Sequence, residues 1–89
     1  MDVPEIPDFN SLVTIFPNPS ANNFTITIHN YDFKPYNIEL LDFVGRTVLN
    51  MNNQTIMDVD INTTFIDAGM YFIRITKGDM VTEKKIVIY

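Results

Sequence analysis

The chain has 89 residues, a formal net charge of −5 and no cysteine. This length supports one compact domain rather than two, and the lack of cysteine excludes disulfides, thiolate catalysis and zinc–thiolate sites. The six basic residues are scattered along an acidic chain, which argues against a nucleic-acid partner because phosphate backbones are bound by clustered Lys and Arg. No apolar run approaches the roughly 20 residues of a membrane-spanning helix, so we expect no membrane insertion.

The N-terminal segment is rich in proline and acidic residues. Residues 1–8 contain two prolines and three acids, a composition that keeps a chain extended and solvated. The first run with strand character begins at Val13. We therefore expect residues 1–12 to be a linker and residues 13–89 to form the folded domain.

Short runs of β-branched and aromatic residues follow, many with apolar and polar side chains alternating, the period of a half-buried strand. The alternation places Phe24, Ile26 and Ile28 on one face of their run, and it does the same for Val59 and Ile61. The runs predict seven strands, at residues 13–16, 24–29, 36–40, 46–51, 56–63, 70–76 and 80–89.

Turn residues separate these runs. Two prolines in residues 17–22 end the first strand, because proline lacks the N–H that a ladder needs. Residues 42–45 predict a turn in which Gly45 takes a positive φ. Asn52–Gln54 predicts a polar break, residues 65–69 a tight corner and residues 77–79 a hairpin.

Seven short strands with frequent turns and no helical period are typical of an antiparallel β-sandwich. We therefore expect an all-β, immunoglobulin-like fold of about seven strands. Tyr71 begins the sixth strand, directly after the corner at residues 65–69. Its ring is expected in the core, with its hydroxyl bonded back to the backbone of residues 65–67 as a tyrosine corner.

The chain offers no constellation for catalysis. Its only histidine, His29, lies on the polar face of a predicted strand without an orienting partner. Asp58-Val-Asp60-Ile-Asn62 is similar to the start of a calcium loop, but that loop needs glycine at its sixth position and glutamate at its twelfth, where this chain has Thr63 and Gly69. We expect no enzyme activity and no cofactor, while a weak surface calcium site stays open.

Four motifs along the chain resemble one known family, the type A C-terminal sorting domain of the type IX (Por) secretion system of Bacteroidetes. The resemblance covers nearly all of residues 13–89. One departure is Thr63, at a position that is usually apolar in the family. The motifs, in order, are Ile15-Phe-Pro-Asn-Pro-Ser20, Leu41-Asp-Phe-Val-Gly-Arg46, Gly69-Met-Tyr-Phe-Ile73 and the closing strand Thr82-Glu-Lys-Lys-Ile-Val-Ile-Tyr89.

The resemblance implies a signal domain at the end of a larger cargo protein, which it directs across the outer membrane. The implied partners are the translocon, a surface cysteine peptidase (sortase) that removes the domain, and the upstream cargo in the same chain. The implied location is the periplasm in transit, and then the cell surface or the medium.

The motifs suggest two sets of functional residues. The closing strand ends at the chain terminus, so we expect its edge to be accessible and to be recognised by the translocon through strand addition. This first set is Lys85, Ile86, Val87, Ile88 and Tyr89. The second set maintains the fold that presents the first: Pro17, Asn18, Pro19, Gly45, Gly69 and Tyr71.

A second function remains open, because β-sandwiches also serve as appended binding modules for carbohydrate or protein. Such a module would use exposed aromatic side chains for stacking. The candidates are Tyr31, Phe33, Tyr36 and Phe72.

Overall fold

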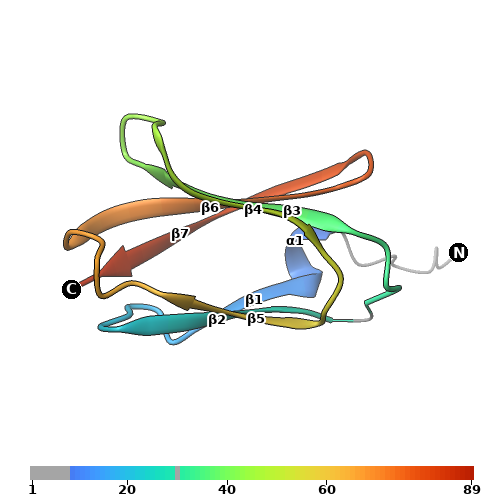
Figure 1. The fold of residues 1–89 in the computed structure, drawn as a ribbon, viewed down its shortest axis with the longest axis horizontal. Helices are drawn as coiled ribbons and strands as arrows, with labels where there is room; N and C mark the ends of the chain where they lie inside the picture. Colours follow the sequence, from blue (N-terminus) through green and yellow to red (C-terminus); the bar gives the residue numbers. More distant parts are fainter. Residues whose placement is uncertain (1–8, 30) are drawn as a thin grey trace, which may run out of the picture.

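The computed structural model describes residues 9–29 and 31–89, which form two facing β-sheets and one helical turn (Figure 1). All strand pairs within the sheets are antiparallel. The prediction of an all-β sandwich is confirmed. The elements are α1 (Phe9–Leu12), β1 (Val13–Phe16), β2 (Asn23–Ile28), β3 (Tyr36–Asp42), β4 (Thr47–Gln54), β5 (Asp58–Asn62), β6 (Gly69–Lys77) and β7 (Met80–Ile88).

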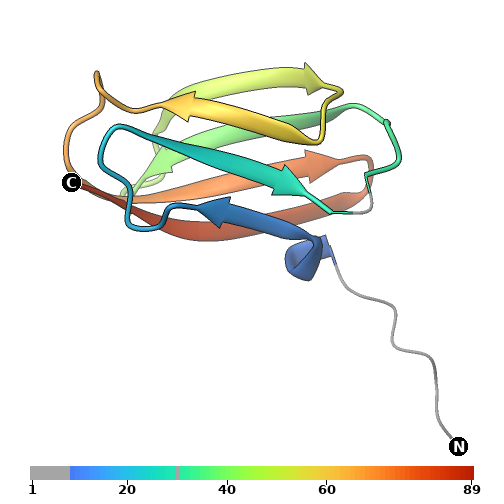
Figure 2. The ribbon, with the colours of Figure 1, turned by 90° about the horizontal axis from the view of Figure 1, so that it is seen from below.

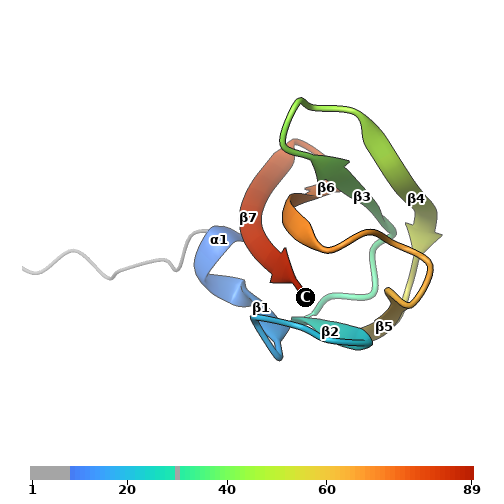
Figure 3. The same cartoon turned by 90° about the vertical axis from the view of Figure 1, so that its left-hand side faces the viewer.

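The strand order is β1-β2-β5 in one sheet and β4-β3-β6-β7 in the other. Figure 2 shows the strands of the two layers running in similar directions, and Figure 3 shows the layers end-on. In the constant-type immunoglobulin arrangement, the sheet that contains the first strand has four strands and the other sheet has three. Here β4 joins the second sheet through its hairpin with β3, so β4 and β7 are the two edges of the larger sheet.

The core lies between the sheets and follows the predicted alternation. Phe24, Ile26 and Ile28 of β2 are buried, as are Val59 and Ile61 of β5, while Asp58 and Asp60 face outward. The second sheet contributes the alternate residues of β3, β6 and β7. These are Ile38, Leu40, Tyr71, Ile73, Ile75, Ile86 and Ile88.

β4 is longer than expected. The predicted break at Asn52–Gln54 is wrong, because β4 continues to Gln54 and pairs it with Tyr36. The register shifts between Tyr36 and Ile38, and Asn53 has a φ of 56°, with its N–H donated to Asn37 Oδ1 at 2.9 Å. Polar residues fit here because β4 is an exposed edge strand that tolerates an irregularity.

The segment before β1 packs on the domain. Phe9 of α1 is buried, and Thr82 of β7 donates a hydrogen bond to Asn10 Oδ1 at 2.8 Å. Figure 3 shows α1 beside β7 and β1. Residues 9–12 therefore do not behave as the expected linker, and residues 1–8 lie outside the described part of the chain. The one helix described is too short to cross a membrane.

Candidate recognition site

The motif turns gather at one end of the sandwich. In Figure 1 the β1–β2, β3–β4 and β5–β6 connections and the C-terminus all lie on the left, with α1 toward the opposite end. Figure 2 shows the β1–β2 and β5–β6 connections beside the C-terminus from a second direction. The end that carries Tyr89 is therefore built largely from the motifs that the sequence singled out.

The first motif lies along the free edge of β7. Asn18 Nδ2 donates to Lys85 O at 3.0 Å, and Val87 N donates to Asn18 Oδ1 at 3.2 Å. Ser20 N donates to Val87 O at 2.8 Å, and Tyr89 N donates to Ser20 O at 2.9 Å, which makes a parallel bridge between Ser20 and Ile88. We call Asn18–Ser20 the strap.

The strap corrects the expectation of an accessible edge at the chain end. The N–H and C=O of Val87 and the N–H of Tyr89 are already bonded, and Ile86 and Ile88 are 0% and 2% exposed within the core. The sequence could not show this, because the strap and β7 are separated by more than 60 residues in the chain. A strand cannot add to this part of β7 while the strap is in place.

The exposed side chains of this end belong to alternate residues. Lys85, Val87 and Tyr89 point away from the core, and Tyr89 is 69% exposed. On the neighbouring strand, Met70 lies opposite Val87, and Phe72 lies opposite Lys85. We call Lys85, Val87 and Tyr89 the exposed row.

The second motif is a turn built around one carboxylate. Asp42 Oδ1 accepts hydrogen bonds from Val44 N at 3.1 Å and Arg46 N at 2.8 Å, while Arg46 Nε donates to Asp42 Oδ2 at 2.8 Å. Burial by itself raises the pKa of the Asp42 carboxyl, but the bonds from Arg46 and Val44 outweigh burial and hold this pKa below its usual range. Gly45 has a φ of 90°, as the turn prediction required.

The third motif contains the predicted tyrosine corner, which is confirmed. Tyr71 is buried, and its hydroxyl donates to Asp67 O at 2.6 Å. Burial, followed by the nearby charges of Asp67 and Asp42, raises the pKa of Tyr71. Gly69 has a φ of 154°, a backbone conformation that side chains disfavour, so the two glycines of the motifs both stand where the backbone needs them.

Two residues of these motifs were not assigned a role from the sequence. Ser20 is fully buried, and its Oγ donates to Asn23 O at 2.7 Å, which orients the strap. Asp42 organises its whole turn. The signal for both was present in the motifs, since Ser20 directly follows Pro19 and Asp42 lies three residues before Gly45. Their hydrogen-bond partners depend on the fold.

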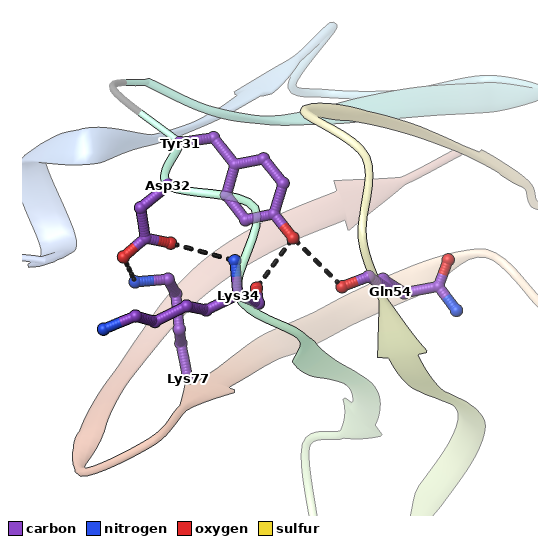
Figure 4. A network of polar contacts seen from close by, with 5 residues as sticks. All are labelled: Tyr31, Asp32, Lys34, Gln54 and Lys77. Carbon is purple, nitrogen blue, oxygen red and sulfur yellow. Dashed lines mark hydrogen bonds and ion pairs between the residues drawn. The ribbon is translucent and has the colours of Figure 1, made fainter.

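The aromatic residues of the alternative binding-module hypothesis are mostly internal. Tyr31 is buried and donates to Lys34 O at 2.7 Å and Gln54 O at 3.3 Å (Figure 4). Beside it, Lys77 Nζ forms an ion pair with Asp32 Oδ2 at 2.8 Å, and the hydrogen bond from Lys77 lowers the pKa of Asp32. This network joins the β2–β3 connection to the end of β6.

The remaining aromatic residues form no stacking platform. Tyr36 is 1% exposed and donates to Ile56 O at 2.5 Å, and burial raises its pKa to about 12. Phe72 is half-buried, and Phe33 is exposed. Coplanar exposed rings, which the binding-module hypothesis needs, are therefore not found among these four residues.

Within residues 9–29 and 31–89, no group of three or more His, Asp and Glu residues could hold a metal ion. The carboxylates of Asp58 and Asp60 accept hydrogen bonds from Thr27 and Thr25 at 2.6 Å each. His29 lies on the surface, with Nε2 3.1 Å from Thr14 Oγ1.

The comparisons with known proteins agree with the motifs. No curated protein matches the chain significantly. The family model for the secretion system C-terminal sorting domain matches residues 14–89, which is nearly the whole of the sandwich. The chain belongs to this family of sorting domains, which are not catalytic and which target cargo for export by the type IX secretion system across the outer membrane to the cell surface or the medium.

Proposed function

We propose that the export machinery recognises this domain through the exposed row, Lys85, Val87 and Tyr89. The observation that carries the proposal is the division of the last strand into two sets of residues. Ile86 and Ile88 are used by the core, and the strap occupies the edge of the backbone. The alternate side chains are what remains available to a partner.

The chemistry of the row suits protein recognition. A positive charge stands beside an apolar side chain and an exposed tyrosine, and Met70 extends the apolar part across to β6. Tyrosine is enriched among the residues that dominate binding energy at interfaces. The strap is bonded to β7, Tyr71 of β6 pairs with Ile86, and Asp42 of β3 pairs with Tyr71. We therefore assign these motifs the role of holding the row in place.

Removal of the domain, which the family resemblance implies, is proposed to fall before Phe9. A peptidase requires an extended, accessible backbone. Phe9 is buried and Asn10 is bonded to Thr82, so cleavage inside α1 or β1 would require local unfolding. The surface cysteine peptidase is the proposed agent, and the upstream cargo is the proposed product.

The test compares variants of the 89-residue chain fused to a reporter with its own export signal, in a host that carries the type IX system. We expect Val87→Ser and Tyr89→Ala to leave the reporter in the periplasm, because both remove partner contacts from exposed positions. Val81→Ser is the matched control, since Val81 is exposed on the same strand at its other end. We expect this variant to be exported normally.

The folded state of each variant is checked by its thermal unfolding midpoint. Normal export of the chain that carries both Val87→Ser and Tyr89→Ala, with an unchanged unfolding midpoint, would contradict recognition through the exposed row. Equal loss of export in the Val81→Ser control would contradict the placement of the recognition site at the exposed row.

A further inference from the structure

We propose that the strap keeps the domain monomeric by closing the edge of β7 to the same strand of a second copy. This goes beyond the proposed function, because it concerns self-association and does not depend on which protein reads the exposed row.

β7 has the features of an aggregation-prone edge. It is nine residues long and has β6 on one side only. In an antiparallel edge strand, alternate residues direct their N–H and C=O groups outward. The bonds made by Val87 and Tyr89 with the strap identify the odd-numbered residues as the outward set. Such a row of unpaired groups is a template for another strand.

The side chains on the exposed face of β7 are complementary to those of a second β7. If two copies pair antiparallel with Lys84 opposite Lys84, then Glu83 lies opposite Lys85 and Val81 lies opposite Val87. Opposite charges and β-branched pairs at directly facing positions stabilise a sheet, while the two half-buried Lys84 side chains on the two-fold axis repel each other and oppose the pairing. Val81, Glu83, Lys85 and Val87 are all exposed. As odd-numbered residues, they also carry the outward backbone groups. The resulting dimer would have the isologous symmetry that is commonest in homodimers.

The strap uses the same atoms that this pairing would need. Lys85 O, Val87 N and Val87 O are each bonded to Asn18 or Ser20. The strap itself does not form a new edge to which another strand could add, because Pro17 and Pro19 have no N–H to donate to that strand. At the other end of β7, α1 lies alongside the strand and is held through Asn10 and Thr82.

The strap is anchored independently of Asn18. Ser20 is buried and bonded to Asn23 O, so a change at Asn18 removes two bonds to β7 without removing this anchor. Asn18→Ala therefore exposes Lys85 O and Val87 N. Asn22→Ala is the matched control, because Asn22 is an exposed asparagine of the same connection and the described residues include no hydrogen bond from its side chain.

The experiment measures amide exchange and oligomeric state of the 89-residue chain over a range of concentrations. We expect Asn18→Ala to accelerate exchange at Val87 about fivefold at low concentration, which corresponds to one hydrogen bond of about 1 kcal/mol. At high concentration we expect a dimer for this variant, and a stronger one for Asn10→Ala combined with Asn18→Ala. Wild type and Asn22→Ala are expected to remain monomeric.

Val87→Pro separates pairing through this edge from association caused by unfolding. The N–H of Val87 points to the strap and not to β6, so proline there removes an outward donor and leaves the β6–β7 ladder intact. We expect Asn18→Ala combined with Val87→Pro to be monomeric. A monomeric double variant of Asn10 and Asn18 with fast exchange at Val87 would overturn the proposal. So would unchanged exchange in Asn18→Ala, or a dimer that persists with proline at position 87.

Discussion

Tyr71 connects the corner before β6 to the core through one hydroxyl group. Its ring is buried, and its hydroxyl donates to Asp67 O at 2.6 Å. We expect Tyr71→Phe to lower the free energy of unfolding by about 1 kcal/mol, because the hydrogen bond is lost and Asp67 O is left with one partner fewer. Urea denaturation measures this change.

Tyr89→Phe is the control for the Tyr71 experiment, because Tyr89 is 69% exposed and loses only a solvated hydroxyl. We expect its stability to match that of the wild type. Equal stability of Tyr71→Phe and the wild type would show that the corner bond contributes nothing.

Thr63 carries a buried hydroxyl that has no partner among the described residues. It is 2% exposed, and its Oγ1 makes no hydrogen bond there. We expect Thr63→Val to raise the free energy of unfolding by about 1 kcal/mol, because an uncompensated polar group leaves the core. The urea midpoint should rise.

Thr64→Val provides the matched comparison for Thr63. The Thr64 hydroxyl is exposed and donates to Asn62 Oδ1 at 2.8 Å, so no gain is expected there. A lower midpoint for Thr63→Val would indicate that the hydroxyl has a partner in solution, such as an ordered water molecule.

At the scale of elements, the strands could be predicted from the sequence, but their contacts with distant segments of the chain could not. Alternation placed Ile26, Val59 and Ile61 correctly in the core, because strand periodicity is a local property of the sequence. The corner at Tyr71 was also predictable, since its partner, Asp67, lies four residues away. The site of contact between Asn18 and β7 depends on residues distant in sequence, and no local pattern carries it.

The same reasoning explains the errors at the ends of elements. Asn52–Gln54 is polar enough to predict a break, yet an edge strand buries little and so tolerates polar residues. Phe9 is a single apolar residue beside a proline-rich segment, and periodicity cannot detect one anchor. Its burial is decided by the space beside β7, which the fold creates.

α1 provides a test of where the folded domain begins. We expect Phe9→Ala to lower the free energy of unfolding by about 3 kcal/mol, near the low end for truncating a buried phenylalanine. Asn10→Ala should cost about 1 kcal/mol, since it removes only the bond with Thr82. Thermal or urea unfolding of both variants checks this order, and wild-type stability in Phe9→Ala would place the boundary after α1.

At the scale of the whole molecule, the motifs form a framework at one end of the sandwich. The strap covers one edge of β7, which carries the exposed row, and the Tyr71 corner and the Asp42 turn order the connections before β6 and after β3 at the same end. The described residues include no cluster of His, Asp and Glu that could hold a metal ion. As a member of the sorting-domain family, the chain targets its cargo for secretion.

The measurement that tests this account most directly is the fraction of a reporter found outside the cell. The reporter carries its own signal for export to the periplasm and is expressed in a host with the type IX system, with and without residues 1–89 at its C-terminus. We expect the reporter to reach the surface or the medium only when the domain is attached and the system is intact. An attached reporter that stays in the periplasm, or that leaves the cell equally well in a host lacking the system, would contradict the account.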